Sequence, residues 1–259
     1  MPYIEPQELE KLIIGCLHNF YRRRMQRINE LKLGAMLRRK NPYLYRSLGT
    51  EKASEIVEDI LSAFISSSDE AIFGETFFEP IAKIASGGKV SSAEGVDFEL
   101  ETDDKYLAVA VKSSPNWANA SQKKRINDEF MALRKRLYKI HKQFDAVIGH
   151  GYGRAVSGSS KTRIYRYVSG QAFWTEITGD PEFYLKLIRL MKDEPQKHKE
   201  EYKAAWDAAV NRFSNEFINT FCYPDGRINW DELVRFINED KKPAVKKNNS
   251  LEKWIPNQE

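Results

Sequence analysis

The stretch that most restricts the fold is residues 95–112, where the hydrophobic pattern changes from a helical period to strict alternation. In GVDFELE, residues 95–101, apolar and acidic side chains alternate, which predicts a strand with one apolar and one acidic face. Residues 102–105 predict a turn, and the apolar run 106–111 predicts the second strand of a hairpin. We therefore expect Lys112 to stand at the end of a buried strand.

Residues before the hairpin show helical periodicity. Apolar positions recur at helical spacing over residues 7–33, and a second helix is expected after Thr50, which is a suitable N-cap. The polar run Ser66–Asp69 predicts a break between that helix and a further one over residues 70–85. We therefore expect the N-terminal third to be helical.

Strands and helices both follow the hairpin. Ser121 is expected to cap a long basic helix over residues 122–143, and residues 149–158 are rich in glycine. We expect further strands at 145–148, 162–168 and 172–177, and mainly helix from Asp180 to about residue 239. This order predicts an α/β fold: a mixed β-sheet flanked by helices, with an N-terminal helical region and a helical C-terminal region.

The charge distribution indicates a polyanionic partner. The net charge is only +4, but residues 21–46 hold nine basic side chains and one acid, Glu30. Such a segment attracts nucleic acid first and an acidic membrane second, although a solvated helix face would look the same. Two distant cysteines, an acidic N-terminus unlike a signal peptide, and the absence of a long apolar run predict a cytoplasmic protein that does not enter a membrane.

The hairpin also carries residues suited to phosphodiester hydrolysis. Magnesium prefers carboxylate oxygens, and a lysine beside the attacked phosphate stabilises negative charge and orients water. Asp97 lies on the first strand and Lys112 ends the second, while Glu75 and Glu79 lie on the preceding helix. Since neighbouring strands lie about 5 Å apart, these groups could meet around one ion. Glu79 is our preferred helix ligand, and Glu75 is the alternative.

This arrangement resembles the PD-(D/E)XK nuclease superfamily, in which an aspartate precedes an acid-x-lysine triplet. Here the triplet falls on Ala110, Val111 and Lys112. The segments NPYLYR (41–46), SSSDEAIFG (66–74), VKSSPNWAN (111–119) and GHGYG (149–153) resemble the motifs of PmeII-like type II restriction endonucleases. The resemblance implies cleavage of double-stranded DNA, Mg²⁺ with Mn²⁺ as a substitute, a homodimer, and a cognate DNA methyltransferase as genetic partner.

The alanine at position 110 departs from that pattern. Three explanations stay open: another ligand such as Glu99 replaces the missing acid, the alanine inactivates an engineered chain, or the protein is a naturally silent relative. The main-chain carbonyl at position 110 or 111 can still bind a metal, so we count Val111 with Asp97 and Glu99 as candidate ligands. The alternatives to an active restriction enzyme are a silent DNA-binding protein and an RNA-directed nuclease.

Candidate DNA contacts lie in the basic N-terminal segment, after the catalytic strand, and in the glycine-rich loop. Amide side chains can bind base edges, and basic side chains bind phosphates; ordinary loop structure and solvated charge are the alternatives. The candidates are Arg22, Arg23, Arg24, Arg38, Arg39, Lys40, Ser113, Asn116, Trp117, Asn119, Gln122, Lys123, Lys124 and Arg154. We expect a helical DNA-contacting region over 1–68, a nuclease core over 69–179, a helical region over 180–239 and a polar tail over 240–259.

Overall fold

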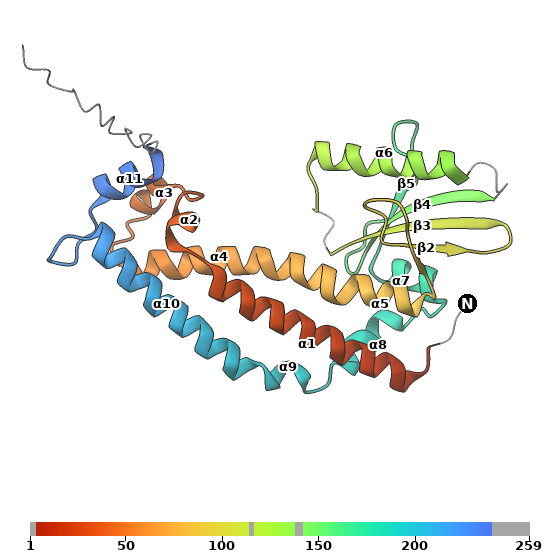
Figure 1. Cartoon of the computed structure of the whole chain (residues 1–259), viewed down its shortest axis with the longest axis horizontal. Helices are drawn as coiled ribbons and strands as arrows, with labels where there is room; N and C mark the ends of the chain where they lie inside the picture. The colour runs from red at the N-terminus through yellow and green to blue at the C-terminus, as the bar shows by residue number, and fades with distance from the viewer. Residues whose placement is uncertain (1–3, 114–116, 138–141, 240–259) are drawn as a thin grey trace, which may run out of the picture.

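The computed structural model describes residues 4–113, 117–137 and 142–239. Three long helices lie along one another, with a β-sheet at one end and short helices at the other (Figure 1). The helices before the sheet are α1 (Pro6–Glu30), α2 (Leu33–Leu37), α3 (Pro42–Ser47), α4 (Ala53–Phe73), the π-helix η1 (Gly74–Phe78) and α5 (Glu79–Ala85). The later helices are α6 (Ala120–Arg136), α7 (Gly170–Thr178), α8 (Phe183–Leu190), α9 (Glu194–Lys197), α10 (Lys199–Phe221) and α11 (Trp230–Asn238).

The sheet is mixed, as the sequence predicts. Its order is β1-β2-β3-β4-β5, with antiparallel pairing from β1 to β3 and parallel pairing from β3 to β5. The strands are β1 (Lys89–Val90), β2 (Phe98–Glu101), β3 (Lys105–Lys112), β4 (Gln143–His150) and β5 (Tyr165–Ser169). The expected α/β architecture of a restriction-endonuclease-like sheet flanked by helices is confirmed.

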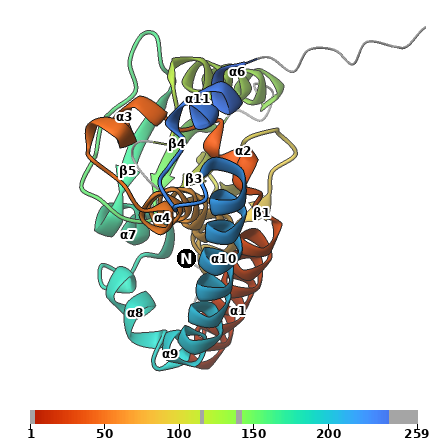
Figure 2. The same ribbon diagram turned by 90° about the vertical axis from the view of Figure 1, so that its left-hand side faces the viewer.

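Alternation along β3 gives the sheet two buried faces. Val109 and Val111 belong to a hydrophobic cluster with residues of α1, α5 and α7, whereas Ala108 and Ala110 belong to one with α6. A third cluster joins α2, α4, α10 and α11 at the far end, beyond the sheet. Seen along the molecule, α1, α4 and α10 form a packed bundle (Figure 2), so the sheet is held at one end of a helical platform.

The predicted break at Ser66–Asp69 is wrong, because α4 continues through it to Phe73. Two of the polar side chains have partners on α1: Arg24 Nη2 lies 2.7 Å from Asp69 Oδ2, and Arg27 donates to Ser68 Oγ at 3.2 Å. Ile65 and Ile72 are buried on the same helix. Tertiary pairing thus outweighs the preference of serine and aspartate for caps.

The predicted strand at 172–177 is also wrong, because these residues form α7. Phe173, Trp174 and Ile177 are all buried at helical spacing. Gly170, at φ 55°, allows a sharp turn directly from β5, and a Cβ there would lie 2.3 Å from the Gly153 carbonyl oxygen. A short apolar run does not distinguish a buried strand from a buried helix.

Several boundaries also differ from the prediction. Lys52, rather than Thr50, is the N-cap residue of α4, and α6 ends at Arg136, before the expected residue 143. Asn119, rather than Ser121, caps α6 through a capping box with Gln122, so α6 begins at Ala120. The strand expected at 145–148 extends through His150, which the sequence pattern placed in a glycine-rich loop. No helix in the described ranges combines the length and apolar character needed to cross a membrane. The division of the chain at residues 68, 179 and 239 stays a prediction.

Candidate active site

Asp97 and Lys112 meet at the edge of the sheet where β3 ends. Phe98 pairs with Val109 across the antiparallel strands, and Asp97 N–H donates to the Val109 carbonyl at 2.9 Å. Extending this register by one residue places Asp97 opposite Ala110. Side chains two apart share a face of a strand, so Asp97, Ala110 and Lys112 lie on the α6 face of the sheet.

The Asp97 carboxylate is held rigidly and is largely withdrawn from water. Its Oδ2 accepts a hydrogen bond of 2.6 Å from Val111 N–H and lies 3.6 Å from Lys112 Nζ. The side chains of Lys112 and Asp97 are 26% and 16% exposed. Burial raises the pKa of Asp97, while the Lys112 ammonium and the Val111 N–H act in the opposite direction. Burial is the larger effect, so a second cation would stabilise the ionised form.

Glu79, the first residue of α5, faces the same site. Burial raises its pKa, the Asp97 carboxylate adds to this rise, and Lys112 counters it. The Lys112 ammonium is the main charge that acts on the pKa of Asp97, and it lowers that pKa. Two carboxylates therefore converge on one lysine.

Glu75 instead lies exposed and pairs with Arg23, whose Nη2 is 2.7 Å from Glu75 Oε2. The two helix glutamates, expected to be alternatives, thus face different surroundings. The π-helix η1 approaches the end of β3 so closely that a Cβ on Gly74 would lie 3.0 Å from Ser113 Cβ. This contact brings Ser113 beside the helix that carries Glu79.

His150 is a site residue that the sequence pattern missed. It ends β4 in register with Lys112 and is 1% exposed, and its Nδ1 has no hydrogen-bond partner among the described residues. Its ring stacks on Tyr167 at 5.7 Å, and burial lowers its pKa, which favours the neutral imidazole. The sequence Gly-His-Gly at residues 149–151, directly after an apolar strand, was the signal from which this residue could have been predicted.

A family model supports a nuclease assignment for this fold and site. Residues 7–200 match the model described as type II restriction endonuclease EcoO109I. The chain belongs to this restriction endonuclease family. The matched region runs from α1 to the start of α10 and includes the whole sheet. No curated protein gives a significant match. The narrower PmeII-like and PD-(D/E)XK assignments stay predictions.

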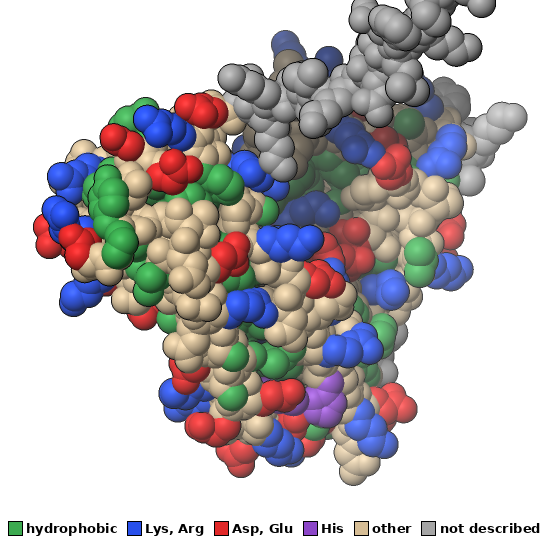
Figure 3. Space-filling model, turned by 60° about the vertical axis from the view of Figure 1, so that its left-hand side comes forward, with side chains coloured by type: hydrophobic (Ala, Val, Ile, Leu, Met, Phe, Trp, Pro, Cys, Tyr) green, Lys and Arg blue, Asp and Glu red, His purple; other side chains and the backbone are tan. Residues whose placement is uncertain are grey.

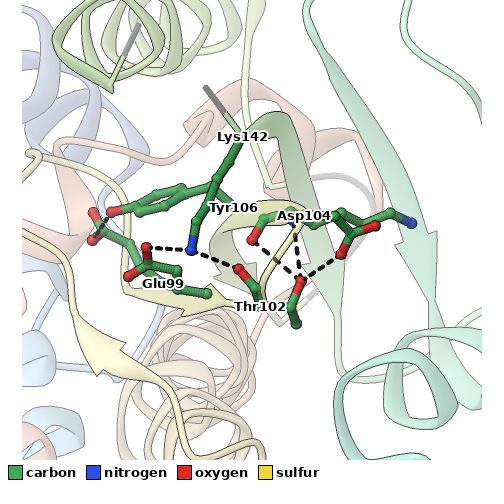
Figure 4. Close-up of polar contacts among 7 residues, drawn as sticks. Glu99, Thr102, Asp104, Tyr106 and Lys142 are labelled. Atoms are coloured by element: carbon green, nitrogen blue, oxygen red, sulfur yellow. Dashed lines mark hydrogen bonds and ion pairs between the residues drawn. The ribbon is translucent and has the colours of Figure 1, made fainter. Parts of the chain in front are cut away.

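Glu99 lies midway along the hairpin, two residues from Asp97, and is held by contacts there. Its carboxylate accepts hydrogen bonds from the Tyr106 and Ser91 hydroxyls. In Figure 4 the Glu99 and Tyr106 side chains point toward each other, and Lys142 Nζ donates to the Thr102 carbonyl at 2.7 Å. Glu99 shares the strand face of Asp97, but its carboxylate already has partners. It is a weaker candidate than Glu79 for replacing the missing acid.

The residues after β3 form one side of the candidate site. Lys112 Nζ lies 5.9 Å from the Trp117 ring centroid, and Trp117 Nε1 is buried without a hydrogen-bond partner among the described residues. Asn119 and Gln122 bond each other's backbone as the cap of α6, which reduces their freedom to contact bases. Lys123 and Lys124 follow on α6 as exposed side chains. Asn116 lies outside the described residues.

The predicted basic contacts are dispersed over the surface and do not form a single patch. Arg24 pairs with Asp69 and stacks 3.5 Å from the Tyr202 ring centroid, so its geometry supports a structural role. Arg22 is exposed and donates to Asn19, and Arg23 pairs with Glu75.

The basic residues around α2 lie near aromatic rings. Arg38 lies over the Phe236 ring at 4.6 Å, and Arg39 and Lys40 lie 6.0 and 5.5 Å from the Phe64 ring centroid. In Figure 1, α2 and α3 stand on the same side of α4 as the end of β3. Figure 3 shows a hollow between two lobes, with Lys and Arg side chains on its walls. Arg154 is exposed in the loop after β4.

Proposed function

We propose that this chain is a metal-dependent, site-specific endonuclease that hydrolyses double-stranded DNA, as a type II restriction enzyme does. The observation that carries the proposal is the convergence of Asp97, Lys112 and Glu79 at one sheet edge in a chain of the restriction endonuclease family. A buried acid pair beside a lysine is an arrangement in which a divalent cation and a phosphate both find complementary charge.

The donor set fits magnesium. Asp97 and Glu79 offer hard carboxylate oxygens, the Val111 carbonyl is the nearby main-chain donor, and both carboxylates have pKa values raised by burial. These three residues would hold Mg²⁺, with Mn²⁺ as a substitute. When bound, the metal supplies charge neutralisation at the phosphate and a more acidic water.

Lys112 is the residue assigned to the reacting phosphate. Its ammonium is partly buried and is fixed near Asp97, so it is positioned to orient the attacking water and to stabilise charge that develops on the phosphate oxygens. Water adds to phosphorus as the bond to the leaving oxygen breaks. Ala110 contributes a methyl group, so this chain has one fewer carboxylate than the PD-(D/E)XK pattern.

A hollow with Lys and Arg side chains on its walls supports a duplex partner (Figure 3). Lys123 and Lys124 are exposed on α6. Cationic surfaces bind phosphates independently of sequence. A homodimer would present two such edges, one for each strand, and a cognate methyltransferase would protect the host's own sites.

A silent DNA-binding protein is the second candidate, because position 110 is fully buried and lies opposite Asp97 without a carboxylate. Plasmid DNA incubated with Mg²⁺ or Mn²⁺ separates the two functions, with Ala110→Glu tested beside the parent and Asp97→Ala as control. Discrete fragments from the parent support the enzyme. Cleavage by Ala110→Glu alone means that alanine disables the site. Binding without cleavage by either sinks the enzyme proposal, and cleavage of RNA alone points to a different nuclease.

A further inference from the structure

A second cluster of metal-binding side chains lies on the helical platform. It joins His18 on α1 to Glu194 on α9 and His198, the residue between α9 and α10. Glu194 and His198 are four residues apart, and His18 is 176 residues from Glu194 along the chain. The cluster shares no residue with the Asp97–Lys112 site.

The three donor atoms already converge. His18 Nε2 lies 2.6 Å from Glu194 Oε1, His198 Nε2 lies 3.5 Å from the same oxygen, and all three ligand atoms lie within 4.8 Å of one another. Zinc bonds of about 2.0–2.1 Å in a tetrahedron place donor atoms roughly 3.3 Å apart. The ligand atoms therefore need only small rotamer adjustments to surround one ion.

His198 shows that the hydrogen bonding here is incomplete. Its Nε2 is buried and has no hydrogen-bond partner among the described residues, although it faces the Glu194 carboxylate. The ring is fixed from two sides, because Tyr21 stacks on it at 4.2 Å and His18 meets it edge-on at 5.5 Å. Buried polar atoms normally have a partner, and a metal on Glu194 would supply one.

The chemistry of the donors selects the ion. Two imidazole nitrogens and one carboxylate oxygen suit zinc, whereas calcium and magnesium prefer oxygen alone. Lys197 Nζ bonds the other oxygen, Glu194 Oε2, at 2.6 Å, which keeps the carboxylate ionised and leaves Oε1 to the histidines. The His18 side chain is 55% exposed, so the fourth position opens to water.

We propose that His18, Glu194 and His198 form a zinc site that fastens α1 to the α9–α10 junction. The site is structural: the ion would hold α1 against the start of α10, two elements that lie far apart in the sequence. Because the platform supports the sheet, zinc would stabilise the fold without taking part in hydrolysis. A simple acid–imidazole hydrogen bond between His18 and Glu194 is the competing explanation.

The test uses the full chain carrying Asp97→Ala, which removes the proposed nuclease metal site, after treatment with a chelator and dialysis. Titration calorimetry with zinc chloride is expected to give one zinc per chain. Tm should rise by about 5–10 °C at a hundredfold excess over Kd. His18→Ala and His198→Ala should each weaken binding at least about tenfold. Lys192→Ala, which removes the neighbouring pair with Glu10, is the matched control and should keep the affinity.

Because His18 is exposed, His18→Gln should fold normally while losing zinc affinity. Loss of binding in this variant would therefore not be caused by misfolding. Cobalt(II) provides a second readout, since its visible absorption reports coordination by the histidines and should disappear in His18→Gln. Absence of zinc binding to the Asp97→Ala chain, or binding unchanged by both histidine substitutions, overturns the proposal. Because nuclease activity is not measured, the result is independent of the proposed enzymatic function.

Discussion

At both ends of the β2–β3 hairpin an acidic side chain lies beside a lysine, but the pKa of the acid is lowered at one end and raised at the other. At the turn, Lys142 pairs with Glu101 at 2.7 Å and lowers the pKa of that carboxyl. At the other end, Asp97 and Glu79 share Lys112, and burial raises the pKa of both acids. The turn end satisfies its charges locally, whereas the far end keeps an excess of buried acid, as expected where a cation and a phosphate bind.

The largest contrast is expected between two lysines. Lys112→Met should lower the DNA cleavage rate about 10²–10³-fold, because it removes the fixed charge beside the attacked phosphate. Lys142→Met removes a lysine just before β4 that bonds Glu101 and Thr102 at the turn end of the hairpin, and it should leave cleavage close to the parent rate. Single-turnover cleavage of a plasmid measures both. Equal losses in the two variants would contradict the assigned role of Lys112.

The next contrast is between two acids of the hairpin, Glu99 within β2 and Asp97 just before it. Glu99→Gln weakens the hydrogen bonds from Tyr106 and Ser91, so it should lower the free energy of unfolding by about 1 kcal/mol while cleavage persists. Asp97→Asn should abolish cleavage. Urea denaturation with and without Mg²⁺ separates the effects. If Glu99→Gln removes stabilisation by Mg²⁺, then Glu99 is the ligand that replaces the missing acid.

The hairpin could be predicted from sequence because alternation and an interrupting turn act within eighteen residues. In the structure, the register of this hairpin places Asp97 opposite Ala110. His150 could not be found in this way, since it reaches Lys112 only through the parallel pairing of β3 with β4. The pattern ended that strand at Ile148, before the glycines. Gly149 is required there because a Cβ would lie 2.1 Å from the Phe173 ring.

Other errors have the same origin in distant contacts. The local sequence of Ser66–Asp69 predicts a helix break, but Arg24 and Arg27 on α1 supply the partners that keep α4 intact. The apolar run at residues 172–177 predicted a strand, but these residues form a helix whose Phe173 and Trp174 pack in the cluster with the sheet. The preference for Glu79 over Glu75 stays a prediction, and the Arg23–Glu75 pair is an observation in its favour that the sequence could not supply.

The smallest expected effect compares these two glutamates in metal-free protein. Since the pKa of Glu79 is raised in the folded state, the folded chain binds its proton more tightly than the unfolded chain. This contribution to stability is full below the unfolded pKa of about 4.3 and is lost as pH rises through the folded pKa. Glu79→Gln removes this pH-dependent loss of stability, so at pH 7 the substitution should raise Tm by on the order of 2 °C.

Glu75→Gln is the matched control, because Glu75 is exposed and pairs with Arg23 at the surface, where such pairs contribute little. Thermal melts from pH 4 to pH 8 in a chelator should therefore show a weaker decline for Glu79→Gln than for the parent. Glu75→Gln should change the decline only slightly, because the Glu75 charge is a minor cause of the raised pKa of Glu79. At pH 7, added Mg²⁺ should make the parent and Glu75→Gln more stable than Glu79→Gln, since it stabilises only a chain that keeps both carboxylates. A parent that gains no stability from Mg²⁺, or a Glu75→Gln chain that loses the gain, would remove Glu79 from the metal site.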